Sequence, residues 1–416
     1  MQAIAGSIRE QVGALSDRQS MEMAERYGTH NYNPLPINIV RATGARAWDG
    51  AGKEYIDCIG CYSAVANGHL SPAVMRAMAE QMEVLTLISR AVYTPESALF
   101  LKTICEYTGM DKCCPMNTGA EAVETCIKLA RKWGYKVKGI PEGQAEIIVA
   151  EGNFHGRTTT IVGFSSEPGF RDGFGPFTPG FVTVPFGDLD ALKAAITPNT
   201  AAVLMEPVQI EGGILFPPPG FLSGARKVCD ENDVLLCWDE VQTGFYRTGK
   251  RFGWMHEEAK PDMMCLGKAL GGGVFPVSAA VGVEKVMSVF GFGDHGSTFG
   301  GNPLGAAVAI AAMQDMEQNR LGDSSERMGA LLFDGLSALK LRFPGMIEDV
   351  RGKGLLVGLD VGLGAHAKAL AKALPGAGIL TKETRSGTFR YTPPLVVDET
   401  DVAEIVERTE MALASV

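Results

Sequence analysis

The stretch VLLCWDE at 234–240 decides the fold class, because a continuous apolar run ends there in two acidic residues. Five consecutive apolar residues lack the alternation of a half-exposed strand, so we expect a strand that is buried on both faces. Similar apolar runs recur at intervals and are separated by helical patterns: EIIVA at 146–150, AAVLME at 201–206, MMCLG at 263–267 and VSAAVG at 277–282. This pattern predicts an α/β fold with a mostly parallel sheet that helices cover on both faces.

The two ends of the chain differ from this middle region in their pattern of predicted strands and helices. Residues 36–60 read as short strands with glycine-bearing turns, which predicts a β-meander. A polar helix start near 320 is followed by strands around 346–361 and 378–395 and by a closing helix from about 399. We therefore expect an N-terminal segment 1–60 that belongs to a small domain, a large domain over 61–319, and a small α+β domain over 320–416.

Composition excludes several function classes. The 416 residues carry a formal net charge of -10, which argues against a nucleic-acid partner. No apolar run reaches the roughly 20 residues of a membrane helix, and the first residues lack a basic-then-apolar export signal. Of the nine cysteines, Cys58 and Cys61 match a redox or zinc spacing, but no second pair at metal-ligand spacing follows, so we expect small, buried, reduced thiols. We expect a cytoplasmic enzyme that acts on small molecules.

Two polar residues stand at the carboxyl ends of predicted strands, where open α/β sheets bind their ligands. Asp239 ends the run at 234–238, and a buried carboxylate there needs a partner. Lys268 lies between the apolar run at 263–266 and a glycine cluster, where desolvation lowers the pKa of an amine and makes it nucleophilic. Taken singly, a capping aspartate and a solvated lysine are the simpler interpretations. Together the two side chains have complementary chemistry.

A third element, Asn-Thr-Gly-Ala-Glu at 117–121, precedes a strong helical pattern. Free backbone N–H groups at a helix N-terminus bind anions such as phosphate. An ordinary helix cap is the alternative.

Seven motifs in this order carry a resemblance to a known family: NTGAEAVE at 117–124, NFHGRT at 153–158, EPVQIE at 206–211, WDEVQTG at 238–244, LGKALGGG at 266–273, HGSTFGGNPLG at 295–305 and RGKGLL at 351–356. The chain resembles the class III (ω-) aminotransferases of fold type I. Within that family it is most similar to the ornithine δ-aminotransferases, through NYNPLP at 31–36, CYSAV at 61–65, KLARKWGYKVKGI at 128–140 and DGFGPF at 172–177. The resemblance implies the pyridoxal 5'-phosphate (PLP)-dependent transferase fold type I.

The resemblance also implies PLP as the cofactor and a set of residues that bind it. Lys268 is expected to hold PLP as a Schiff base, and Asp239 to pair with the pyridine nitrogen and keep the ring an electron sink. The remaining contacts that it implies are Gly119 and Ala120 at the phosphate, Phe154 and Val241 on the two faces of the ring, Gln242 at the ring's O3', and Thr298, which reaches the phosphate from a neighbouring subunit. A homodimer with shared active sites follows from the last contact.

The substrates that the resemblance implies are an amino-acid donor and a 2-oxo acid acceptor. Arg157 is expected to bind an α-carboxylate in bidentate fashion, and Tyr32 and Tyr62 to line an ornithine pocket. Glu211 and Arg390 match a gate pair, in which the carboxylate masks the arginine for an amine substrate and releases it for the second carboxylate of glutamate. The expected reaction moves the terminal amino group of ornithine, or of a similar diamino acid, to 2-oxoglutarate.

Two positions depart from the family pattern. Ile210 stands where the family usually has glycine, and its bulk bears on the placement of Glu211. His155 replaces a larger aromatic residue, and we interpret both changes as bearing on the amine substrate rather than on the cofactor. Lysine, diaminobutyrate, 4-aminobutyrate and acetylornithine remain alternative substrates. A PLP epimerase, mutase or decarboxylase on the same fold, and a non-enzymatic binding protein, are the alternatives in other classes.

Overall fold

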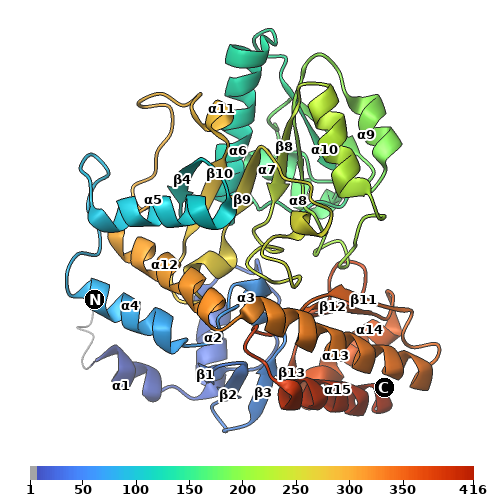
Figure 1. The fold of residues 1–416 in the computed structure, drawn as a ribbon. Coiled ribbons are helices and arrows are strands. Elements are labelled where there is room, and N and C mark those ends of the chain that lie inside the picture. Colours follow the sequence, from blue (N-terminus) through green and yellow to red (C-terminus); the bar gives the residue numbers. More distant parts are fainter. Residues whose placement is uncertain (1–6) are drawn as a thin grey trace.

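A seven-stranded sheet forms the centre of the protein in the computed structural model, which describes residues 7–416 (Figure 1). Its strands lie in the order β4-β10-β9-β8-β7-β5-β6. They are β4 Lys112–Met116, β5 Glu146–Ala150, β6 Phe181–Val184, β7 Thr200–Met205, β8 Leu235–Asp239, β9 Met263–Leu266 and β10 Ser278–Gly282. Only β10 runs antiparallel to its two neighbours, β4 and β9. The mostly parallel sheet that the apolar runs predict is therefore present.

Both faces of this sheet are buried, as the continuous apolar runs predict. In β8, Leu235 and Cys237 pack with helix α6 (Gly119–Trp133), whereas Leu236 and Trp238 pack in the core on the opposite face. That opposite core includes residues of α5 (Pro95–Thr108), α10 (Phe221–Glu231) and α12 (Pro303–Gln318). The strand therefore buries alternate side chains against two different layers of helices. A polar side chain can avoid this apolar environment only at the end of the strand.

The chain ends form two further sheets in the lower half of Figure 1. The N-terminal strands β1 (Ile39–Thr43), β2 (Arg46–Asp49) and β3 (Glu54–Asp57) form the predicted meander, and β13 (Ile379–Leu380) pairs parallel to β3. The second sheet has the order β11-β12-β14. Its strands and the helices near it are β11 Asp349–Lys353, β12 Leu356–Asp360, β14 Thr388–Tyr391, α13 Leu321–Arg342, α14 Ala365–Gly376 and α15 Glu399–Ala414.

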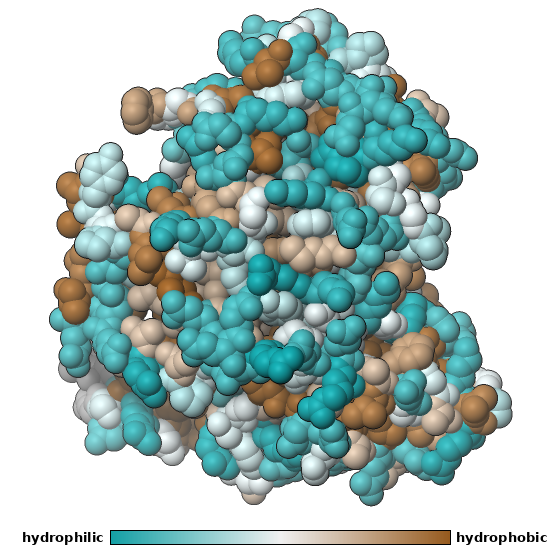
Figure 2. Space-filling view, in the orientation of Figure 1, coloured by the Kyte–Doolittle hydropathy of each residue, from teal (hydrophilic) through white to brown (hydrophobic). Residues whose placement is uncertain are grey.

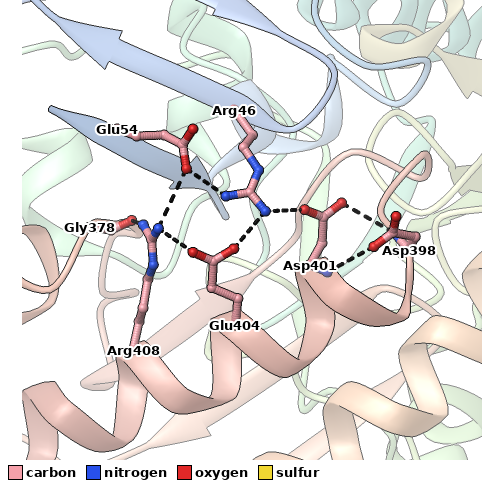
Figure 3. Close-up of polar contacts among 7 residues, drawn as sticks. All are labelled: Arg46, Glu54, Gly378, Asp398, Asp401, Glu404 and Arg408. Atoms are coloured by element: carbon pink, nitrogen blue, oxygen red, sulfur yellow. Dashed lines mark hydrogen bonds and ion pairs between the residues drawn. The ribbon is translucent and has the colours of Figure 1, made fainter. Parts of the chain in front are cut away.

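A network of ion pairs joins the N-terminal strands to the last helix (Figure 3). Arg46 on β2 lies 2.6 Å from carboxylate oxygens of Glu54, Asp401 and Glu404. Arg408 on α15 pairs with Glu404 and Glu54. Because these side chains are half-buried and several charges share each partner, the network holds residues far apart in sequence together more effectively than one exposed pair does.

The remaining helices complete the layers. They are α1 Ile8–Gly13, α2 Asp17–Tyr27, α3 Gly60–Ser63, α4 Pro72–Met82, α7 Thr159–Gly163, α8 Pro168–Arg171, α9 Leu189–Ala195 and α11 Glu284–Met287, with a π-helix at Gly134–Lys138 and short 3-10 turns at Gly253–His256 and Lys268–Gly271. Over residues 7–416, none of the helices combines the length and the apolar character needed to cross a membrane.

Candidate active site

A cavity of about 180 Å³ opens at the carboxyl ends of the parallel strands. It is lined by residues from the ends of β7, β8 and β9, from the segment after β5 and from the start of α6. The lining residues are Gly119, Ala120, Phe154, His155, Gly156, Glu206, Val208, Asp239, Val241, Gln242, Thr243 and Lys268. The structure thus brings the two predicted catalytic residues and five of the six predicted cofactor contacts into one cavity.

Lys268 follows β9 in a left-handed backbone conformation, with φ of 44°. Residues other than glycine adopt this region at a cost, and such strain is concentrated at functional sites. Its Nζ donates a hydrogen bond of 2.6 Å to Oε1 of Gln242. Burial of the amine lowers the pKa of Lys268 to about 8, despite the opposing charges of Glu211 and Asp239. A large fraction of this amine is therefore unprotonated and nucleophilic at mildly alkaline pH.

Asp239 ends β8 and is buried, with both carboxylate oxygens occupied. Oδ1 accepts the backbone N–H of Val241 at 3.0 Å, and Oδ2 lies 2.7 Å from Nδ1 of His155. Burial alone lowers the pKa of the His155 imidazole, but the hydrogen bond and charge of Asp239 outweigh it and raise that pKa. The imidazole therefore contacts the aspartate that is expected to meet the cofactor ring, a contact that the sequence-based interpretation of His155 did not include.

The start of α6 provides an anion site. The Thr118 side chain accepts the N–H of Glu121, and the Glu121 carboxylate accepts the N–H groups of Asn117 and Thr118. This capping box leaves the N–H groups of Gly119 and Ala120 without a protein acceptor among the described residues. Both face the cavity at the positive end of the helix, where a phosphate binds favourably.

PLP, the cofactor that the resemblance implies, fits these residues. Nε2 of Gln242 is buried and makes no hydrogen bond with the described residues, so it is free to donate to an oxygen on the ring. A Cβ at Gly119 would lie 2.8 Å from Cγ1 of Val241, so glycine is required for the helix start to approach that side chain. Phe154 and Val241 supply apolar surfaces to the cavity, and Asp239 supplies a carboxylate for a protonated ring nitrogen.

Glu206, at the end of β7, is a second buried acid in the cavity that no role was predicted for. Its Oε2 accepts the backbone N–H of Phe154 at 3.1 Å. Burial raises the pKa of Glu206 to about 7, with a further increase from the charge of Asp239, although His155 opposes it. The sequence signal for Glu206 is the same as for Asp239, since each acid directly follows an apolar run.

The predicted gate pair forms a bidentate ion pair beside this cavity. Nη1 and Nη2 of Arg390 lie 2.5 and 3.0 Å from Oε1 and Oε2 of Glu211. Arg390 is only 2% exposed, and its Cζ lies 5.0 Å from the centroid of the Tyr62 ring. Burial raises the pKa of Glu211, but the hydrogen bond and charge of Arg390 outweigh it and lower that pKa. Tyr32 is 73% exposed at the outer side of this group.

Ile210 leaves the gate pair in place. Its side chain is buried in a small apolar cluster with Val208, Ile214 and Leu356, and the Glu211 carboxylate nevertheless reaches Arg390. Bulk at this position therefore does not displace Glu211, contrary to what the departure from the family pattern suggested.

Arg157 and Thr298 lie outside the cavity lining. Arg157 is exposed, and its guanidinium stacks on the Phe170 ring with Cζ 3.8 Å from the centroid. It makes no hydrogen bond with the described residues, so its donors are available to a carboxylate. Thr298 is also exposed, and it lines a separate hollow with residues 87–91 of the same chain.

The cysteines behave differently from the expectation that all nine are buried. Cys61 is exposed, and Cys105, Cys113 and Cys114 are half-buried. The thiols of Cys126, Cys237 and Cys265 lie within 4.8 Å of one another in the core between α6 and the sheet. Because these three residues come from distant elements, spacing along the chain does not reveal their proximity.

Comparison with known proteins gives consistent results. The family model for aminotransferase class-III matches residues 27–413. The ornithine aminotransferase of Brevibacillus brevis is 49% identical over 393 residues, which are 94% of this chain and 97% of that protein. The ornithine aminotransferase of Bordetella pertussis is 47% identical and covers 90% of both chains.

Solved structures agree with these relatives. The ornithine aminotransferase from Toxoplasma gondii superposes with a TM-score of 0.95 at 38% identity, over 98% of this chain and 97% of that chain. An acetylornithine aminotransferase from Elizabethkingia anophelis has a TM-score of 0.88 at 39% identity, over 97% of this chain and all of that one.

Proposed function

This chain belongs to the class-III aminotransferases, a PLP-dependent family of fold type I, and we propose that it transfers the terminal amino group of ornithine to 2-oxoglutarate. The expected family, fold class and cofactor are thereby confirmed. The observation that carries the substrate proposal is the buried Glu211–Arg390 pair beside the Lys268 cavity. The products are glutamate and an amino-acid semialdehyde, in which an aldehyde replaces the terminal amine of ornithine.

Lys268 and Asp239 perform the central chemistry in this proposal. Bound PLP supplies an aldehyde for covalent attachment and a ring that stabilises negative charge at a substrate carbon. Lys268 Nζ, whose pKa is lowered to about 8, would attach the cofactor covalently. Once the terminal amine of the substrate has displaced it from the cofactor, the freed Lys268 amine would remove a proton from the terminal carbon of the substrate as a general base. Asp239, which His155 contacts at 2.7 Å, would pair with the protonated ring nitrogen of the cofactor. Gln242 would donate to the ring oxygen of the cofactor, and the first N–H groups of α6 would bind its phosphate.

The two substrates need two electrostatic surfaces at one pocket. Arg157 anchors the α-carboxylate of ornithine, since its five donors are free and planar. With Glu211 on Arg390, the distal end of the pocket is nearly neutral and tolerates an amine. When the Glu211 carboxylate moves off Arg390, the Arg390 guanidinium binds the α-carboxylate of 2-oxoglutarate. The other carboxylate of 2-oxoglutarate binds Arg157. Tyr62, which lies over Arg390, and the exposed Tyr32 line the path of the substrate chain.

A homodimer completes the site in this proposal. Thr298 lies outside its own chain's cavity, which supports a role at the phosphate of a second copy. Several large hydrophobic residues on and after α4 are exposed: Met75, Met82, Val84, Leu87, Ile88, Val92 and Tyr93. Figure 2 shows brown, hydrophobic patches along the left margin of the molecule, on the side where α4 lies in Figure 1. Clusters of this kind favour a protein interface.

The pairing of β3 with β13 supports a small domain built from residues 1–60 and 320–416, apart from the large domain at 61–319. Nine unpaired cysteines favour the cytoplasm.

A screen of amine donors against 2-oxoglutarate tests this function. Ornithine is expected to give glutamate and a trappable aldehyde at a higher kcat/KM than acetylornithine, lysine, diaminobutyrate or 4-aminobutyrate. Preference for acetylornithine would instead place the chain with the Elizabethkingia anophelis neighbour, and turnover without any 2-oxo acid would indicate an epimerase, mutase or decarboxylase.

A further inference from the structure

Arg385 is a cation at the substrate end of the site that sequence analysis did not single out. It lies in the loop between β13 and β14, five residues before Arg390. Its guanidinium crosses to the segments that follow β5 and β7, where Nη2 donates a hydrogen bond of 2.9 Å to the carbonyl oxygen of Gly152. Its Cζ lies 5.3 Å from the centroid of the Phe170 ring, on which Arg157 also stacks.

The guanidinium of Arg385 makes only one hydrogen bond of ordinary length. Beyond the bond to Gly152, it makes two long contacts of 3.4 Å, from Nη1 to Oε2 of Glu167 and from Nε to the backbone oxygen of Glu211. An arginine has five N–H donors in a planar fork, and a carboxylate normally occupies two of them at shorter distance. Arg385 therefore has the capacity to bind one more carboxylate.

Glu211 lies between two arginines. Its carboxylate forms an ion pair with Arg390, whereas its backbone carbonyl oxygen lies 3.4 Å from Nε of Arg385. Burial raises the pKa of Glu211, but the Arg390 bond together with the charges of Arg390, Lys268 and Arg385 lowers it, so the group stays ionised. The two guanidinium groups therefore contact the same residue, Arg390 through the carboxylate of Glu211 and Arg385 through its backbone oxygen.

The proposed exchange of substrates creates a need for such a second partner. When a dicarboxylate takes Arg390, the Glu211 carboxylate is displaced while still partly buried, and a buried charge without a partner is strongly unfavourable. We propose that Arg385 receives the displaced Glu211 carboxylate and thereby acts as a specificity-determining residue for the 2-oxo acid half-reaction. This inference rests on the proposed gate. It states which side chain binds the Glu211 carboxylate while a dicarboxylate substrate occupies Arg390.

Binding of two unreactive probes tests the inference in the holoenzyme. Glutarate presents two carboxylates and needs an open gate, whereas valerate presents one and needs only Arg157. Arg385→Gln retains a donor for Gly152 but loses the charge, so we expect the Kd of glutarate to rise about tenfold and that of valerate to change far less. Arg385→Lys keeps the charge and should restore part of the glutarate affinity. Calorimetry gives both constants, and single-turnover rates with 2-oxoglutarate and ornithine should show the same bias.

Arg351, on β11, offers a matched control because it contacts the same segment after β7. It donates to the backbone oxygens of Gly213 and Ile214 at 2.8 and 3.1 Å, and its charge is already matched by Asp349 and Asp360. Arg351→Gln should therefore weaken glutarate and valerate binding alike. Equal losses for the two probes in Arg385→Gln would show that Arg385 is only a structural clamp of this kind, and would overturn the inference.

A double variant separates this inference from the gate itself. Because Arg385 acts through Glu211, its substitution should have no effect on the ratio of the two Kd values in the Glu211→Ala background. A glutarate-specific loss that persists in the double variant would mean that Arg385 binds the substrate directly, and would refute the inference. If Glu211→Ala alone leaves the ratio unchanged, the gate fails. If Glu211→Ala favours glutarate and Arg385→Gln leaves the ratio unchanged, only the role of Arg385 fails.

Discussion

Nδ1 of His155 lies 2.7 Å from Oδ2 of Asp239, and neither side chain is appreciably exposed. The pair connects the segment after β5 with the end of β8, two elements that are separated by β7 in the sheet. Because burial raises the cost of a carboxylate with too few partners, the imidazole stabilises the negative charge that Asp239 presents to the cavity.

Replacing His155 by phenylalanine should lower kcat and weaken cofactor binding without loss of the fold. The variant removes one hydrogen bond to a charged group, worth about 1.5–3 kcal/mol, so a rate loss of about tenfold to a hundredfold is expected. His155→Gln, which keeps an N–H donor, should lose less. Steady-state rates and the Kd for added PLP measure both effects, and equal values for wild type and His155→Phe would show that Asp239 does not depend on this contact.

The buried Glu206 should make stability depend on pH. Its pKa is raised to about 7 in the folded protein, chiefly by burial, from an ordinary value of 4.5. The folded state therefore binds this proton more tightly than the unfolded chain does. The resulting stabilisation, about 3 kcal/mol, is fully present below about pH 4.5 and is lost as the pH rises through 7.

Glu206→Gln removes this titration while it keeps an oxygen for the N–H of Phe154. The melting temperature of the variant, relative to wild type, should therefore increase between pH 5 and pH 8. The exposed Glu142 serves as the control, since Glu142→Gln should shift the melting temperature equally at both pH values. A constant difference for Glu206→Gln would mean that this carboxyl ionises normally in the folded state.

Lys268→Ala should abolish turnover and the covalent attachment of PLP, while the fold and the phosphate site persist. In the wild-type apoenzyme, attachment requires the unprotonated amine, so its rate should rise with pH to a midpoint near 8 rather than near 10.5. Borohydride reduction followed by peptide mass spectrometry locates the modified lysine. The exposed Lys250 is a control, and a reducible adduct on any lysine other than Lys268 would contradict the assignment.

Substitutions in the gate pair should affect the two half-reactions unequally. Glu211→Ala leaves Arg390 permanently available, so reactivity toward glutamate should rise relative to ornithine. Arg390→Ala should impair mainly the half-reaction of glutamate and 2-oxoglutarate. A fixed structural salt bridge predicts equal damage to both, because breaking a buried pair leaves an unpaired charge at a cost of about 3–5 kcal/mol. Single-turnover rates decide this, and an unchanged ornithine-to-glutamate ratio in Glu211→Ala would remove the gate from the mechanism.

The class of sheet and the cofactor cavity could be predicted because they depend on local patterns. An apolar run of strand length that ends in a polar residue indicates both a buried strand and the place where its end meets a ligand, which is how Asp239 and Lys268 were found. The capping residues at 117–121 likewise indicate a helix start from neighbouring positions alone. The resemblance supplied the gate pair, whose members are 179 positions apart.

The tertiary structure decided which of these side chains meet and with what consequence. From the sequence we related His155 to the choice of amine substrate and Ile210 to the placement of Glu211. The contact of His155 with Asp239 was not predicted, because a side chain's direction depends on how its segment packs against strands far away in the chain. The pKa values of Lys268 and Glu206 depend on the same packing, since burial and nearby charges set them. Periodicity along a chain determines which faces are apolar. Only the folded arrangement of α6, β7, β8, β9 and the loop that carries Arg385 determines how the charges of this site are paired.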